Sequence, residues 1–236
     1  MPEQKLPDAV SRRKFLNYAA LSSVMGVALI SCTKEFREGE PNAPFAQDDP
    51  QNMPKNTVNL GSGDIGILNY AYALEQLEAA FYIKAASSFY AGATMKEKTF
   101  LEDIRDHEIA HREFFKTALG SKAIGSLLFD FSSIDFNSRD SVLSTAKAFE
   151  DLGVSAYNGA GELLKSPDYL LLAGKIVSVE ARHAAAIRDL LSYGSFAGPD
   201  VIDGNGLDVF RMPKEVLAIA GNYIETKIIA NNLPTS

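Results

Sequence analysis

Hydrophobic residues recur at helical spacing in four long segments, residues 64–90, 95–119, 140–165 and 168–192. In each segment apolar side chains return every three or four positions, which places them on one face of a helix. No segment alternates between apolar and polar positions as a half-buried strand does. The pattern therefore predicts an all-α fold built around four long helices.

Each of the four predicted helices carries a glutamate inside its apolar stripe. The second and fourth helices also carry a histidine three residues after that glutamate, and such a pair shares one helix face. Burying a carboxylate without a partner costs several kcal/mol, so four on core faces need a common cause. The residues concerned are Glu75, Glu108, His111, Glu150, Glu180 and His183.

Two helical hairpins would bring these six groups to matching heights. With a turn near Gly92, the glutamate of the first helix lies 17 residues before the turn, and the Glu-x-x-His pair lies 16 and 19 residues after it. With a second turn near Ser166, the glutamate of the third helix lies 16 residues before the turn, and the Glu-x-x-His pair of the fourth helix lies 14 and 17 residues after it. The link at 121–139 can span ~60 Å when extended, more than the ~38 Å length of such helices. It can therefore cross the bundle, so that the glutamate and the Glu-x-x-His pair of one hairpin lie at the same height along the bundle as those of the other hairpin.

The two halves of this region also repeat each other. The stretch "EQLEAAFY" places Tyr82 seven residues after Glu75, and "EDLGVSAY" places Tyr157 seven residues after Glu150. With these motifs, residues 58–195 resemble the ferritin-like superfamily of di-iron and di-manganese carboxylate proteins. In that template two helices each supply a glutamate and two others each supply a Glu-x-x-His pair. More narrowly, "GSGDIGILNYAYALEQLEAAFY" and "AFEDLGVSAYNGAG" resemble the exported ferritin-like domain family of bacteria.

The resemblance implies a four-helix bundle over residues 61–195, with a long crossover between its second and third helices, that binds two iron or two manganese ions. Four carboxylates balance the charge of two divalent ions, and oxygen-rich ligands without thiolate suit iron or manganese. The implied ligands are two terminal carboxylates, two bridging carboxylates and one imidazole for each metal: Glu75 and Glu150, Glu108 and Glu180, and His111 and His183, respectively.

Two other carboxylates compete for places in this set. Glu78 follows Glu75 by three residues and could replace it if the helix rotates slightly, although the repeated tyrosine spacing favours Glu75. Asp151 competes with Glu150 on similar grounds. His107 lies one residue off the ligand stripe, so we expect it to face solvent.

The tyrosines and glycines of the bundle leave alternatives open. Tyr82 and Tyr157 are expected one or two turns from the metals, where they could hydrogen-bond ligands, pass electrons, or simply fill the core with a satisfied hydroxyl. Gly153, Gly159 and Gly161 each cost the third helix ~1 kcal/mol. They indicate either a close helix approach or room for a small molecule near the metals.

The N-terminal residues resemble an export signal. Paired arginines in "SRRKFL", residues 11–16, precede an apolar stretch that is too short and too polar for a stable membrane span. The arginine pair resembles a twin-arginine signal, and "LISC", which ends at Cys32, resembles a lipobox. We therefore expect residues 1–31 to be a signal peptide, Cys32 to carry lipid, and residues 32–60 to form a disordered tether. The competing interpretation is a buried N-terminal helix with a chance cysteine.

Composition narrows the partners. The 236-residue chain has one cysteine, which excludes an intramolecular disulfide and a cysteine-rich metal site. Its net charge of −7 would fall to −9 without residues 1–31, which hold four basic and two acidic residues. This balance gives no support to a nucleic-acid partner. The expected partners are metal ions, a small oxidant, and a membrane reached through lipid in the bacterial cell envelope.

The predicted site indicates redox chemistry. Two metal ions can bind peroxide or dioxygen between them and move two electrons together, so an enzyme of this kind would be a di-metal oxidoreductase of the ferroxidase, peroxidase or catalase type. The alternative is a stress-related structural or binding module with incidental metal or none. Iron storage is less favoured, because a lipidated tether would obstruct a closed shell.

In residues 196–236, Pro213 opens a short amphipathic helix through Val216, Ile219, Tyr223 and Ile228. We expect this helix to pack on the bundle or to contribute to a homodimer.

Overall fold

The computed structural model describes residues 57–235, all of which belong to one compact unit. The predicted signal peptide, the lipidation site Cys32 and most of the predicted tether lie outside the described residues. The elements are β1 (Thr57–Asn59), α2 (Gly63–Ser87), α3 (Met95–Leu119), the 3-10 turn η2 (Gly120–Lys122), α4 (Arg139–Gly161), α5 (Pro167–Leu191), α6 (Pro213–Ala220) and β2 (Lys227–Ile229).

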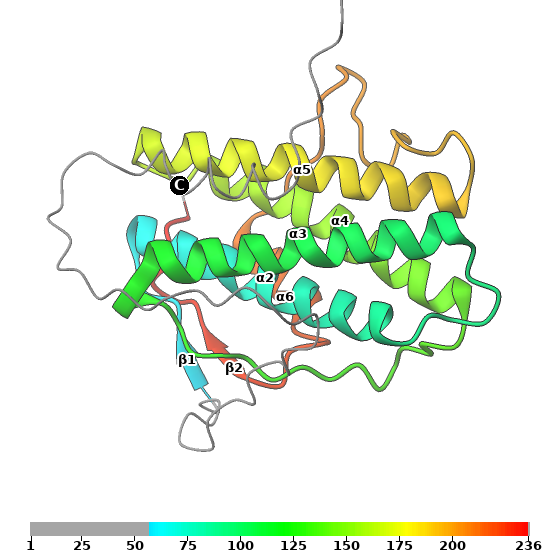
Figure 1. Ribbon diagram of the computed structural model, residues 1–236. Helices are drawn as coiled ribbons and strands as arrows, with labels where there is room; N and C mark the ends of the chain where they lie inside the picture. The colour runs from blue at the N-terminus through cyan, green and yellow to red at the C-terminus, as the bar shows by residue number, and fades with distance from the viewer. Residues whose placement is uncertain (1–56, 236) are drawn as a thin grey trace, which may run out of the picture. The chain divides into compact units, whose positions relative to one another are not determined.

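The four long helices form the predicted all-α bundle. α2 packs along α3 and α4 packs along α5, while contacts between α2 and α4 and between α3 and α5 join the two hairpins. The connection from α3 to α4 runs the length of the bundle, as the long crossover requires (Figure 1). Within residues 57–235, no helix is both long and apolar enough to cross a membrane.

The hairpin turns fall where the sequence predicted them. Gly92 has φ of +77°, a left-handed conformation that other residues rarely adopt. Thr94 and Glu97 then form a capping box at the start of α3, in which Glu97 Oε2 accepts a hydrogen bond from Thr94 N at 2.7 Å. Ser166 caps α5, and Pro167 occupies its first turn. These local signals fix the lengths of the helices and therefore the register of the hairpins.

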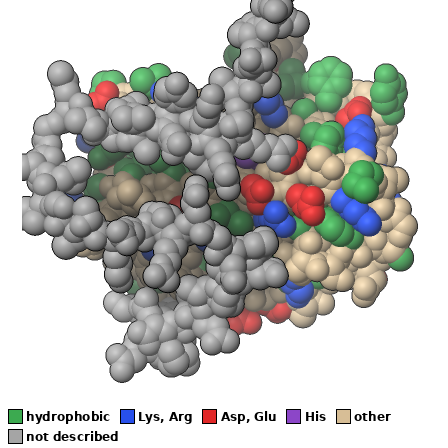
Figure 2. Space-filling view, viewed as in Figure 1, with side chains coloured by type: hydrophobic (Ala, Val, Ile, Leu, Met, Phe, Trp, Pro, Cys, Tyr) green, Lys and Arg blue, Asp and Glu red, His purple; other side chains and the backbone are tan. Residues whose placement is uncertain are grey.

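Buried polar side chains on α2 hold the crossover in place. Asn69 donates from Nδ2 to the carbonyl of Lys122 at 2.9 Å and accepts from Ile124 N at 2.9 Å. Gln76 accepts from Leu127 N at 3.0 Å. Because the crossover covers α2, this helix is buried on nearly every side. α3 is different: acidic and basic side chains are intermixed on its outer face (Figure 2). Its buried residues follow one stripe that includes Glu108.

The C-terminal extension departs from the prediction. α6 forms as expected and packs on α4, but it ends at Ala220, before Gly221. The predicted continuation of this helix through Tyr223 and Ile228 is therefore wrong. Glycine has the lowest helix propensity after proline, so Gly221 favours an end of the helix, and the apolar residues beyond it serve a different element.

That element is a parallel pair of short strands that the periodicity did not reveal. β1 pairs with β2 so that Val58 lies opposite Ile228, and Leu60 N donates to Ile229 O at 3.0 Å. Three-residue strands are too short to show an alternating pattern. Val58 and Leu60 are buried, so the last residues of the segment 32–60, expected to be disordered, instead belong to the fold.

Candidate metal centre

The six side chains singled out in the sequence meet in the interior of the bundle. The four glutamates come from four different helices, α2, α3, α4 and α5, and each is 0% exposed. His183 is buried, and the side chain of His111 is 14% exposed. The matching heights predicted from the hairpin turns therefore hold for all six.

Four of these residues surround a first point. Glu75, Glu108, His111 and Glu180 each offer one ligand-type atom, and these atoms lie within 4.8 Å of one another. His111 Nδ1 lies 2.7 Å from Glu180 Oε1 and 3.5 Å from Glu75 Oε2. α2, α3 and α5 thus supply one nitrogen and three carboxylates to a common centre.

A second group lies beside the first and shares two members with it. Glu108, Glu150, Glu180 and His183 also offer atoms within 4.8 Å of one another. His183 Nδ1 lies 2.9 Å from Glu108 Oε1, 3.3 Å from Glu180 Oε2 and 3.5 Å from Glu150 Oε2. The shared residues, Glu108 and Glu180, are the two for which the family resemblance implied a bridging role.

The hydrogen bonding of these groups tests whether metal ions fit. Among the described residues, ten buried side-chain nitrogen and oxygen atoms have no hydrogen-bond partner, and eight of them belong to these six side chains. The short contacts to the imidazole nitrogens do not have hydrogen-bond geometry. Buried polar atoms are almost always satisfied in native proteins. Eight that converge on two points are compatible with two divalent cations bound there, which would accept their lone pairs.

Glu75 and Glu150, the peripheral glutamates that each belong to only one of the two groups, accept a hydrogen bond from a tyrosine at Oε1. Tyr82 donates from its hydroxyl to Glu150 Oε1 at 2.6 Å, and the Tyr157 hydroxyl donates to Glu75 Oε1. Each bond joins α2 to α4, so each tyrosine fixes the glutamate of the opposite hairpin. The second oxygen of each carboxylate, Oε2, remains free to face the cluster. Of the roles open for these tyrosines, the structure therefore shows hydrogen bonding to the glutamates.

Glu78 is buried but lies in neither group. Its carboxylate lies against Gly153 on α4, where a Cβ would come within 2.8 Å of Glu78 Oε1. Burial, followed by the charges of the surrounding glutamates, raises the pKa of Glu78 well above its usual value. Gly153 thus makes room for a carboxyl group, whereas Gly159 makes room for backbone, because a Cβ there would lie 2.0 Å from the carbonyl oxygen of Arg211.

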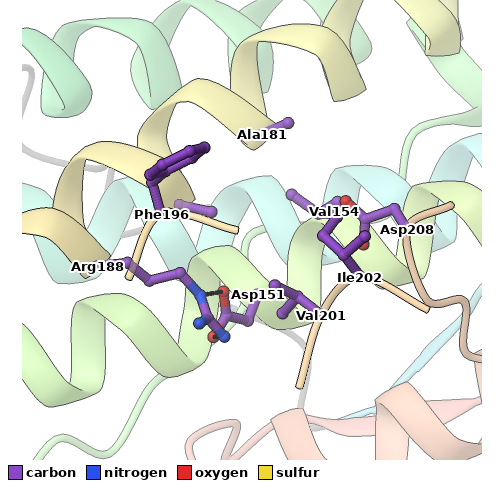
Figure 3. A pocket seen from close by; sticks show the side chains of 9 residues that line it. Asp151, Val154, Ala181, Arg188, Phe196, Val201, Ile202 and Asp208 are labelled. Carbon is purple, nitrogen blue, oxygen red and sulfur yellow. Dashed lines mark hydrogen bonds and ion pairs between the residues drawn. The ribbon is translucent and has the colours of Figure 1, made fainter. Parts of the chain in front are cut away.

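Asp151, the other competitor, faces away from the cluster. It accepts two hydrogen bonds of 2.7 Å from Arg188, from Nε and from Nη2. Both side chains line a cavity of about 40 Å³ between α4, α5 and the loop after α5, where Phe196 and Ile202 supply apolar walls (Figure 3). Asp151 therefore belongs to an ion pair on the outer side of α4.

Four side chains of the cluster have pKa values shifted in directions that add positive charge or remove negative charge. Burial and the charge of Glu180 raise the pKa of Glu108, and burial likewise raises the pKa of Glu150. Burial opposes ionisation of His111 and His183, but their contacts with the glutamates outweigh it and raise the pKa of both imidazoles. Protons and divalent cations therefore compete for the same site.

His107 is the functional candidate that the sequence analysis missed. Its side chain is exposed, as expected, yet its Nδ1 lies 2.9 Å from Nε2 of His183. Desolvation of the part of the ring that packs against α5, followed by the two neighbouring imidazoles, lowers the pKa of His107. A position one residue off the stripe still reaches across to α5, which helical periodicity on a single helix cannot indicate.

Comparison with known proteins agrees with this architecture. A family model described as a ferritin-like domain matches residues 63–193, which include all four long helices and all six side chains of the cluster. The chain belongs to this ferritin-like family. A search of curated proteins gave no match.

Proposed function

We propose that the chain binds two iron or two manganese ions through Glu75, Glu108, His111, Glu150, Glu180 and His183, and uses them for redox reactions of peroxide, dioxygen or ferrous ion. The observation that carries the proposal is the convergence of eight unsatisfied buried atoms on two adjacent points. The charges support it as well, since four ionised carboxylates and two neutral imidazoles balance two divalent ions.

The protein's own groups would have distinct tasks. Two metal ions, when bound, can together exchange two electrons with a small oxidant. Glu108 and Glu180 would hold both ions at a fixed separation, because each belongs to both groups. Tyr82 and Tyr157 orient the peripheral glutamates through hydrogen bonds that leave Oε2 facing inward. Burial of the four glutamates keeps bulk water from competing for these positions.

Paired oxidation of ferrous ion by peroxide tests this function. Two ferrous ions and one peroxide, with two protons, give two ferric ions and two water molecules, whereas a single ferrous ion reduces peroxide by one electron and releases hydroxyl radical. The full chain, loaded anaerobically with two equivalents of ferrous ion, should consume one peroxide for every two ferrous ions oxidised, with little radical trapped. A Glu108→Gln/Glu180→Gln variant should behave like free ferrous ion. Equal stoichiometry and radical yield in both proteins would refute the redox function.

A second candidate is a structural or binding module that works without metal. It is favoured by the short contacts that join His111 to Glu180 and His183 to Glu108, because protonated imidazoles there would offset part of the negative charge. The raised pKa values of Glu108 and Glu150 would remove more of it. Failure of the peroxide experiment together with absence of bound metal would favour this candidate.

We also propose that the domain works outside the cytoplasm, anchored by lipid on Cys32. The support is the order of the paired arginines, the apolar stretch and the "LISC" motif in residues 11–32. An exposed location suits removal of peroxide or oxygen at the cell envelope. Labelling with a radioactive fatty acid, compared between the full chain and Cys32→Ser, would test the anchor.

A further inference from the structure

The two histidines of the cluster, His111 and His183, differ in one contact. Both nitrogens of the His183 ring are engaged: Nδ1 faces the glutamates, at 2.9 Å from Glu108 Oε1, and Nε2 faces His107 Nδ1 at 2.9 Å. The two rings are nearly parallel, with 10° between their planes. Among the described residues, the polar contacts of His111 all join its Nδ1 to carboxylates, and its ring lies beside that of His183 with a centroid separation of 6.4 Å.

The sequence explains why only one histidine has this partner. His107 precedes His111 by four residues on α3, one helical turn away. The equivalent position on α5, four residues before His183, holds Val179, whose side chain has no hydrogen-bonding atom. The near-symmetry of the two hairpins is therefore broken at this pair of positions.

We propose that His107 is a positioning residue that orients His183 and makes the two metal sites unequal. This inference rests on the proposed metal binding. An imidazole that binds a metal through Nδ1 carries its proton on Nε2, so His183 would donate that proton to Nδ1 of His107. His107 must then carry its own proton on Nε2. This bond fixes both the tautomer and the rotation of the His183 ring.

The consequence is a difference in affinity between the two sites. A hydrogen bond from the outer N–H of a metal-bound imidazole raises the basicity of the ligand, and losing such a partner costs about 10–100-fold in metal affinity. The site formed with His183 and Glu150 has this support from His107, whereas no residue between 57 and 235 gives it to His111 in the site formed with Glu75. Both sites share Glu108 and Glu180, so the shared carboxylates cannot produce the difference.

Replacement of His107 by leucine and by asparagine separates positioning from simple packing. Asparagine places its Oδ1 on Cγ, where histidine has Nδ1, so His107→Asn keeps an acceptor that His107→Leu removes. The full chain and each variant would be titrated anaerobically with ⁵⁷Fe(II) and followed by Mössbauer spectroscopy. His107→Leu should lower the binding affinity for one of the two ions by about 10–100-fold and alter one of the two quadrupole doublets. His107→Asn should retain the affinity for both ions and both doublets, and Val179→Ala should match the unmodified chain in affinity and spectrum.

The outcomes distinguish this inference from the proposed function. If the unmodified chain binds neither iron(II) nor, in a parallel titration, manganese(II), the proposed metal site fails and the role of His107 fails with it. If the unmodified chain binds two ions and His107→Leu binds them with the same affinities and spectrum, only the role of His107 is overturned. Equal loss in His107→Leu and His107→Asn would also overturn it, because the acceptor would then be irrelevant.

Discussion

Manganese(II) should raise the unfolding free energy of the full chain by about 8 kcal/mol, about 4 kcal/mol for each of the two sites, when the free ion is at ~1,000 times the dissociation constant of each site. The reason is that the folded bundle offers preformed sites that the unfolded chain lacks. For a domain of this size, each of the two sites then contributes an increase of about 8–16 °C in the midpoint of thermal unfolding, so both together raise it by about 16–32 °C. Manganese(II) suits the measurement because it adds no ferrous oxidation chemistry during heating.

Two variants make this prediction specific. Glu108→Gln/Glu180→Gln keeps the side-chain volumes but removes two negative charges that both sites share, so its unfolding midpoint should not respond to manganese(II). Glu113→Gln changes an exposed glutamate on α3 that pairs with Arg112, and should keep the full response. A response of equal size in the double variant would place the bound ions elsewhere.

Arg188→Leu should destabilise the protein by about 3 kcal/mol, the cost of breaking a buried charge pair. The Arg188 side chain is only 3% exposed, and it holds Asp151 on α4 and Asp200 in the loop after α5. Without it, Asp151 keeps its charge in a largely enclosed position, and the loop loses the two hydrogen bonds that join Asp200 to α5. Urea unfolding would measure the free energy, and limited proteolysis would report release of the loop.

Lys147 provides a matched control for this substitution, because it lies near the same two aspartates. Its Nζ is 3.8 Å from Asp151 Oδ2 and 3.5 Å from Asp200 Oδ2, but its side chain is 36% exposed. Exposed ion pairs contribute about 0–1 kcal/mol, so Lys147→Met should change the unfolding free energy little. If both substitutions have the same effect, burial of the guanidinium is not what holds the loop.

The fold could be predicted from sequence where local signals and periodicity agree. The turn glycine Gly92, the cap at Thr94 and the Ser166–Pro167 pair mark helix ends directly, and these ends set the register of the hairpins. β1 and β2 could not be predicted, because three residues carry too little periodicity and their pairing joins distant parts of the chain. The C-terminal helix was extended too far because apolar spacing continues past Gly221 into a strand.

The cluster was visible in the sequence because a glutamate in an apolar stripe is costly unless something compensates it. That reasoning identified the positions but could not specify the contacts between helices. The bonds from Tyr82 to Glu150 and from Tyr157 to Glu75 cross between hairpins, and so does the contact of His107 with His183. Such contacts depend on helix rotation and separation, which the spacing along a single helix does not encode.

The central claim is that the six buried side chains bind two metal ions, and the metal content of the folded chain tests it most directly. The full chain should be loaded anaerobically with iron(II) or manganese(II), freed of excess metal, and measured by elemental mass spectrometry beside Glu108→Ala/Glu180→Ala. We predict two ions per chain, and loss of both in the variant, since each of its alanines removes a ligand from both sites. A folded chain that retains no iron or manganese, or a variant that retains as much as the unmodified protein, would contradict the claim.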